Sequence, residues 1–448
     1  MLTTKHSRSS RVFHTITGKL PRPLGGLALT VSLLNAVPAW SEPLADLLPG
    51  FLKAQNQYKA AMADAAAAGQ NAIASKGGYY PTLDITGTYG NEQQKKHEAS
   101  NSNMASREAD MSLTQRFWDN GATSSSVLAA SLVQRQAEAV VASTRSALLL
   151  RAVSAYANVV RATEVLKFAV TSEGNIKKQT ELENALVERG AGFSTDVLQA
   201  KIQLAGAQAR RTRAEGALRI AINAYRTLFK KEPGPASNMD KLAAPVDRLP
   251  ATVDEAVERA LKNNSLLIAA NLASEIAQAG VSQTRASSYS PTVDGIVEYK
   301  FKRDVNAVAG NQREIFSRVR LNFPFNLGLT AANTLKASER SFDASVYRYA
   351  DTREQIAEQT RNAWEQFKTA GVNADLLANQ ANIAGEFLQY ARKERTLGRR
   401  SLLDVLTGET TEINARSDTA SAQTDVIIAA YTLLEVMGEL NEAALGGK

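Results

Sequence analysis

The sequence consists of two similar halves, and this internal repeat limits the possible folds more than any other feature. The segment Tyr79-Tyr80-Pro81-Thr82-Leu83-Asp84 recurs as Tyr289-Ser290-Pro291-Thr292-Val293-Asp294, an offset of 210 residues (289 − 79). Gly190, followed by Asp196-Val197-Leu198, recurs as Gly398, followed by Asp404-Val405-Leu406, an offset of 208 residues (398 − 190). Two different motifs with nearly the same offset predict one duplicated unit rather than several unrelated domains.

Each half is predicted to hold a helix, two strands, a long helix and a last helix. The alanine-rich segment 43–76 ends at two glycines, and its counterpart 252–287 opens with Thr252, a residue suited to cap a helix. Residues 122–189 and 330–397 contain no proline, and small or apolar residues recur at spacings of three and four, which predicts coiled-coil packing. The last helices are expected at 194–229 and 402–441.

Four segments have the period-2 pattern of strands, at about 80–92, 106–118, 290–303 and 313–326. In the third, Val297, Tyr299 and Phe301 alternate with Glu298, Lys300 and Lys302. One apolar and one charged face suit either a soluble sandwich or a membrane barrel with a wet lumen. Several aromatic residues near these strands are predicted to form the interfacial girdle of such a barrel: Tyr79, Tyr80, Trp118, Tyr289 and Tyr299.

Four strands cannot close a transmembrane barrel, because the smallest such barrels have eight. Several chains must therefore share one barrel, and three chains would supply 4 × 3 = 12 strands. The predicted fold class is mainly α with a transmembrane β-barrel contribution, formed by two helix-strand-strand-long helix-helix repeats in a homotrimer. The predicted organisation is a signal peptide (1–39), a first repeat (40–230), a linker (231–250), a second repeat (251–442) and a short tail (443–448).

The signal peptide also accounts for most of the net charge. Residues 1–39 carry five of the 52 basic residues and no acidic residue, and an apolar run ends in Val37-Pro38-Ala39, a small-x-small cleavage site. Cleavage after Ala39 leaves 47 basic and 45 acidic residues, a net charge of +2 instead of +7. We therefore expect an exported protein without a nucleic-acid partner.

The composition argues against an enzyme. The chain has no cysteine and three histidines, of which His6 and His14 lie in the signal peptide and His97 in a polar segment. This excludes thiol chemistry and cysteine-ligated metals, and leaves no histidine-based triad or metal site. We predict no cofactor, no metal and no catalytic residue. A pore-free periplasmic coiled-coil protein is an alternative, but it leaves the strand pairs unexplained.

The repeated strand openings, the segment Gln115-x-Phe117-Trp118-Asp119-x-Gly121 and the two Gly-x5-Asp-Val-Leu turns resemble the TolC family of outer-membrane channels. The resemblance covers essentially the whole chain after the signal peptide. It implies a trimer embedded in outer-membrane lipid, with a 12-stranded barrel continuous with a periplasmic helical tunnel. It further implies a periplasmic adaptor and an inner-membrane ABC transporter or proton-driven pump as partners.

The resemblance assigns the periplasmic tips to residues 189–194 and 397–402. Matching by position makes Arg400 the gate arginine, Thr195 and Asp196 its acceptors, and Asp404 a member of a constricting aspartate ring, with Thr407 where some members have a second aspartate. From the residues alone, these acids are better explained as first-turn residues favoured by the helix dipole, and Arg400 as a solvated base at a helix start. The adaptor is expected to dock on the tip turns, which contain Gly190, Ser194, Gly398 and Ser401.

Two cargo classes fit this resemblance. The absence of a lipidation cysteine, together with similarity of residues 155–162 and 188–192 to adhesin-exporting relatives, favours type I secretion of a large protein such as an adhesin. Drug or metal efflux is the alternative.

Overall fold

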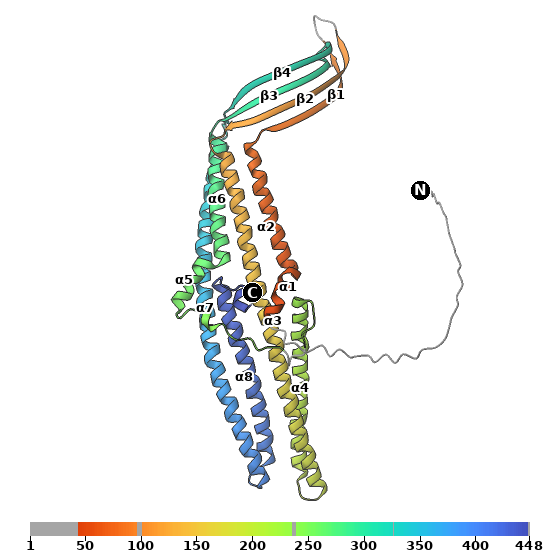
Figure 1. Cartoon of the computed structure of the whole chain (residues 1–448), viewed down its shortest axis with the longest axis vertical. Helices are drawn as coiled ribbons and strands as arrows, with labels where there is room; N and C mark the ends of the chain where they lie inside the picture. Colours follow the sequence, from red (N-terminus) through yellow and green to blue (C-terminus); the bar gives the residue numbers. More distant parts are fainter. Residues whose placement is uncertain (1–43, 96–100, 235–238, 326, 447–448) are drawn as a thin grey trace, which may run out of the picture. The chain divides into compact units, whose positions relative to one another are not determined.

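The computed structural model describes residues 44–95, 101–234, 239–325 and 327–446, all within the compact unit Ser41–Lys448. The predicted signal peptide and His97 lie outside the described residues. The described elements follow the predicted order of two repeats, with the strands at one end and the helical hairpins extending away from them (Figure 1).

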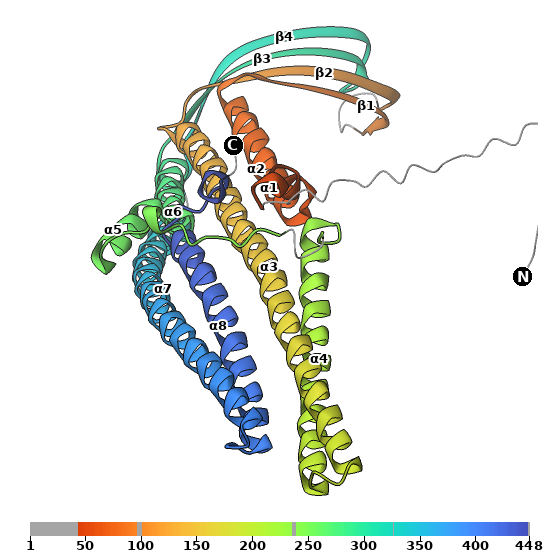
Figure 2. The ribbon, with the colours of Figure 1, turned by 60° about the horizontal axis from the view of Figure 1, so that its bottom comes forward.

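Eight α-helices are described, and none of them carries an apolar stretch long enough to cross a membrane. The long helices α3 and α7 have 67 residues each, and the shorter helices follow one another along them (Figures 1 and 2). The bounds are α1 Leu44–Ala54, α2 Asn56–Ser75, α3 Ala122–Glu188, α4 Ser194–Phe229, α5 Val253–Asn263, α6 Ser265–Tyr289, α7 Thr330–Thr396 and α8 Leu402–Val436.

The segments 43–76 and 252–287 are not single helices, contrary to the prediction. Gln55 separates α1 from α2 and Asn264 separates α5 from α6, both with an extended backbone (ψ 120°). The two breaks are related by the repeat, since they lie 209 residues apart (264 − 55). The last helix also ends earlier than predicted, at Val436 instead of residue 441.

A buried side-chain amide holds each break against the end of a neighbouring helix. The Gln55 amide donates to the carbonyl oxygen of Leu228 in the last turn of α4 (2.6 Å). The Asn264 amide donates to the carbonyl oxygen of Val436 at the end of α8 (2.7 Å). Carbonyls in the last turn of a helix lack an intrahelical donor, so these amides satisfy groups that would otherwise stay unpaired. The breaks therefore depend on contacts between residues far apart in the sequence.

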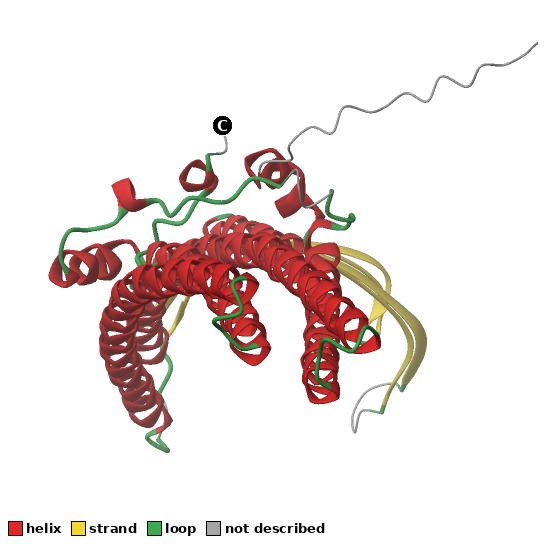
Figure 3. Ribbon diagram, turned by 90° about the horizontal axis from the view of Figure 1, so that it is seen from below, coloured by secondary structure: helices red, strands yellow, loops and turns green. Residues whose placement is uncertain are grey.

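Small side chains let the long helices approach closely. On α4, buried alanines recur at every seventh position, at Ala200, Ala207, Ala214 and Ala221, which is a coiled-coil repeat. Viewed from below, the long helices form a curved layer, and the short helices and connecting loops lie on its convex side (Figure 3). This confirms the predicted coiled-coil packing.

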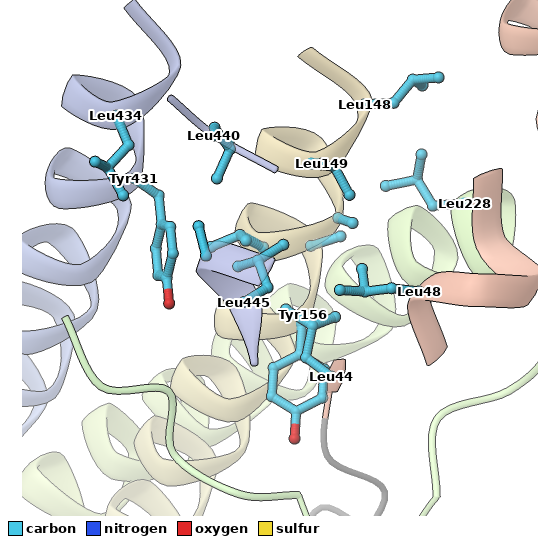
Figure 4. Packing of buried hydrophobic residues seen from close by; sticks show 14 of the residues in the cluster. Leu44, Leu48, Leu148, Leu149, Tyr156, Leu228, Tyr431, Leu434, Leu440 and Leu445 are labelled. Carbon is cyan, nitrogen blue, oxygen red and sulfur yellow. The ribbon is translucent and has the colours of Figure 1, made fainter. Parts of the chain in front are cut away.

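The largest buried apolar cluster lies near the middle of the helical part, where the helix breaks are. Leu44 and Leu48 of α1 pack there with Tyr156 of α3, Leu228 of α4 and Tyr431 of α8 (Figure 4). The 3₁₀ helix Glu442–Leu445 adds Leu445 from the chain's C-terminal side. The cluster thus fixes both repeats to one another at the level of the breaks.

The four strands form one curved antiparallel sheet in the order β1-β2-β3-β4 (Figure 2). Their positions confirm the four strand predictions to within a few residues. The central pair β2–β3 joins the first repeat to the second. The bounds are β1 Thr82–Gln94, β2 Ser102–Trp118, β3 Thr292–Val305 and β4 Val308–Asn322.

Candidate functional site: a two-faced sheet and two helical tips

One face of the sheet is a continuous apolar surface. Ile85, Met111, Tyr299 and Ile315 pair across the four strands in one row, and all four side chains are exposed. The adjacent row contains Leu83, Leu113 and Val297, which are exposed as well. Among the described residues the four strands form one sheet, and no second sheet packs against it. The face has the character of a surface turned to lipid.

The opposite face carries charges that pair across the strands. Lys302 of β3 contacts Glu314 of β4 (2.8 Å) and Glu108 of β2 (4.0 Å). Lys300, two residues earlier, contacts Asp110 of β2 (3.8 Å) and Glu298 of its own strand (3.9 Å). These side chains are at most about one-third exposed. Because alternate residues of a strand face opposite sides, the sheet separates a lipid-compatible face from a hydrated one.

Four of the five predicted girdle residues gather at the end of the sheet next to the helices. Tyr79 and Tyr80 lie just before β1, Trp118 is the last residue of β2, and Tyr289 is the last residue of α6. Each of these side chains is about half exposed or more. Tyr299 instead lies in the middle of β3, between Met111 and Ile315. The girdle role of these residues stays a prediction. Tyr299 lies within the apolar row formed by Ile85, Met111 and Ile315.

The helical tips are tight turns in which glycine is required. Gly190 and Gly398 have positive φ angles of 74° and 72°, a conformation that side-chain-bearing residues rarely adopt. The backbone N–H of each residue after the glycine donates back to the preceding helix, to Leu186 and Glu394, which is a helix-ending motif. In the second tip, Ser401 caps α8 by accepting from the N–H of Asp404 (3.2 Å).

The Arg400 side chain contacts residues of α7, in the same hairpin. Its Nε donates to Glu394 (2.6 Å), and its guanidinium lies over the Phe387 ring. The hydrogen bond to Glu394 raises the pKa of the Arg400 guanidinium above its ordinary value. Thr195 and Asp196 lie in the first turn of α4, on the other hairpin.

Two ion pairs near the tips, which the sequence did not single out, involve almost fully buried carboxylates. Arg395 of α7 donates to Glu183 of α3 (2.8 Å), and this bond links the two hairpins. Arg392 of α7 donates to Glu409 of α8 (3.0 Å), whose other oxygen accepts from Asn175 of α3 (3.3 Å). The Glu183 and Glu409 side chains are only 3% and 2% exposed.

The helical period offered a signal for Glu183. Ala162, Ala169, Ile176 and Glu183 recur at every seventh position of α3, and all four are buried. An acid within a buried stripe needs a charged or hydrogen-bonding partner. The partner itself could not be found from the sequence, because Arg395 lies 212 residues away.

Sequence and structure comparisons agree with this arrangement. The chain matches the Outer membrane efflux protein family over residues 49–229 and 256–439, one range in each repeat. The chain therefore belongs to this family, the TolC family of outer-membrane channels.

Two curated relatives and one solved structure show the extent of the likeness. The chain is 25% identical to the outer membrane protein TolC of Vibrio cholerae serotype O1 over 431 residues, which cover 94% of this chain and 95% of the relative. It is 25% identical over 307 residues to the alkaline protease secretion protein AprF of Pseudomonas aeruginosa, covering 66% and 63%. The outer-membrane channel OprN superposes with a TM-score of 0.79 at 18% identity, covering 89% and 90%.

Family membership confirms several predictions. The protein is an outer-membrane channel with a periplasmic helical tunnel, and it is not an enzyme. Channels of this family are trimers that work with an adaptor and an inner-membrane transporter.

Proposed function

We propose that three copies of this chain form the outer-membrane exit duct of a type I secretion machine that exports a large protein such as an adhesin. The two-faced sheet is the main support for a membrane duct, because its apolar face suits lipid and its ion-paired face suits a hydrated passage. The relative AprF, named for alkaline protease secretion, supports a protein cargo.

Efflux of drugs or metals is the second candidate function, and the description of the family as efflux proteins supports it. Deleting the gene separates the two. Loss of the surface protein with unchanged drug tolerance is expected for secretion. Lost drug tolerance with normal export of the surface protein would contradict it.

The periplasmic tips are the proposed gate. Links between the hairpins, such as Arg395–Glu183, join α7 to α3 near the tips. Arg400 is proposed to add a link to Thr195 and Asp196 of the other hairpin, while Asp404 contributes an acid to the constriction. We expect Arg400→Ala combined with Asp196→Ala to raise single-channel conductance in planar bilayers. An unchanged conductance would remove these two residues from the gate.

The tip turns are also the proposed docking surface for the adaptor. Gly190, Ser194, Gly398 and Ser401 are all exposed. Phe193 next to the first turn is 75% exposed. An exposed aromatic side chain beside a rigid turn is a suitable anchor for a protein partner.

A further inference from the structure

Three arginines lie on the apolar face of the sheet, near the end of the strands that points away from the helices (Figure 1). Arg107 of β2 pairs directly with Arg303 of β3. Arg313 of β4 pairs with Phe301, which lies two residues before Arg303 on β3. All three arginine side chains are exposed, and alternate residues of a strand share one face, so they lie on the same face as Tyr299. We call Arg107, Arg303 and Arg313 the arginine cluster.

The described strand pairs place no acid opposite the arginine cluster. Arg107 and Arg303 oppose each other, and like charges in directly opposite positions destabilise a strand pair. Arg313 is the diagonal neighbour of Arg303, about 7–8 Å away. On the hydrated face, by contrast, Lys302 contacts a carboxylate on each neighbouring strand. The other residues opposite the cluster are uncharged: Tyr89, Phe301 and Asn311.

The contacts of the cluster within the chain leave most of its hydrogen-bond donors available. The Arg107 guanidinium lies over the edge-strand ring of Tyr89, 5.6 Å from its centroid. Arg303 contacts the next residue, Asp304 (3.5 Å), whose other oxygen accepts a backbone N–H of the same turn. Arg313 makes no ion pair with a described residue. Each guanidinium has five N–H donors, so one shared carboxylate cannot satisfy three of them.

The cluster lies at the edge of the apolar band that is farther from the helices. On β3 the band begins at Val293, which pairs with the exposed Leu321. Arg303 lies ten residues further along (303 − 293), about 33 Å along a strand that rises about 3.3 Å per residue. With a strand tilt of about 40°, this is about 25 Å along the membrane normal, the height of the apolar band of an outer-membrane barrel. Since the helices extend into the periplasm, the cluster is level with the headgroups of the outer leaflet.

The apolar row beside the cluster leaves room for an acyl chain. Gly87, Ala109 and Phe301 pair across β1, β2 and β3 in this row. A Cβ at Gly87 would have no other atom within 4 Å, so the surface is shallow there. A ligand at this place meets cationic groups at one height and an apolar surface directly below them. These are the two chemical parts of an anionic lipid.

We propose that the arginine cluster binds the phosphate group of a phosphorylated lipid in the outer leaflet, with the acyl chains of that lipid on the apolar rows below. Guanidinium groups bind phosphate through pairs of parallel N–H···O hydrogen bonds. A phosphate between Arg107 and Arg303 replaces the repulsion of two opposed cations by attraction of both to one anion. The proposal goes beyond the export function and does not depend on the cargo.

Binding of a diphosphorylated glycolipid, lipid A, to the purified full-length oligomer in detergent tests the proposal, with native mass spectrometry as the measurement. The variant that combines Arg107→Gln, Arg303→Gln and Arg313→Gln is expected to bind lipid A roughly tenfold or more weakly than the unsubstituted protein. The corresponding triple lysine variant keeps the charges and should bind more tightly than the glutamine variant. The charge-matched control replaces three exposed basic residues of α3 with glutamine and should bind as the unsubstituted protein does: Arg135, Arg151 and Lys167.

Dephosphorylated lipid A provides a test that needs no substitution. The unsubstituted oligomer is expected to bind it at least roughly tenfold more weakly than lipid A. Equal binding of the two lipids would overturn the proposal, as would equal binding of lipid A by the unsubstituted protein and the triple glutamine variant. Inorganic phosphate is titrated as a competitor and is expected to leave lipid A bound. Displacement of the lipid by an equal concentration of phosphate would show a site for free phosphate and overturn the lipid assignment.

Discussion

Replacing Glu183 with glutamine is expected to loosen the two helical hairpins at the periplasmic end. Glu183 of α3 accepts a hydrogen bond from Arg395 of α7 at 2.8 Å, and these helices belong to different hairpins. Glutamine has nearly the same size and can still accept a hydrogen bond, so the packing is kept. The negative charge, and with it the attraction to the guanidinium, is lost.

The size of the effect follows from the burial of the two partners. A hydrogen bond to a charged group contributes about 1.5–3 kcal/mol. The Glu183 side chain is 3% exposed but that of Arg395 is 30% exposed, so water screens part of the interaction. We expect a loss of about 1–2 kcal/mol in each chain, which changes the ratio of linked to unlinked hairpins roughly 5- to 30-fold.

Single-channel conductance in planar bilayers measures this change. Glu183→Gln should show a higher mean conductance or more frequent long openings than the unsubstituted protein. Glu181→Gln is the matched control, because Glu181 lies on the same helix with a side chain 65% exposed and contacts Lys177 of that helix. Equal conductance of both variants and the unsubstituted channel would refute the role of the Glu183–Arg395 link in holding the tips.

Three further substitutions have definite expected results. Gly295→Val should destabilise the oligomer in heated-gel assays by about 1–3 kcal/mol, because a Cβ at Gly295 would lie 2.4 Å from the Phe117 ring. Asn264→Ala should lower the melting temperature, because it removes the cap of α6 and the bond to Val436. Burial raises the pKa of Glu435, so Glu435→Gln should raise the melting temperature at pH 8, with the gain vanishing below about pH 4.

The sign of the pH effect follows from proton binding. A folded-state pKa above the unfolded value means that the folded state binds the proton more tightly, so the ionised Glu435 opposes folding above the ordinary pKa of a glutamate. A gain that persists undiminished at acidic pH would contradict this reasoning.

Gly87→Val, at a strand glycine with open space around it, controls for the Gly295 variant. Asn271→Ala, on the exposed side of α6, controls for the Asn264 variant. Equal effects in variant and control would contradict the packing or capping argument.

The sequence by itself determined the repeat, the order of the elements, the lengths of the long helices and the two faces of the sheet. These features are periodic and local: the 208–210-residue offset, the spacing of three and four in α3, and the alternation in β3 can be read without knowing any partner. The tip turns at Gly190 and Gly398 were predictable for the same reason, since the turn geometry itself requires glycine.

Only the tertiary structure decided where the short helices break and which charges meet. Gln55 and Asn264 interrupt helices because each amide reaches a carbonyl that lies more than 170 residues away in the sequence. Arg395 of α7 meets Glu183 of α3 only because the fold places these helices next to each other. Such contacts depend on how segments far apart in the sequence pack together, and no local pattern contains that information.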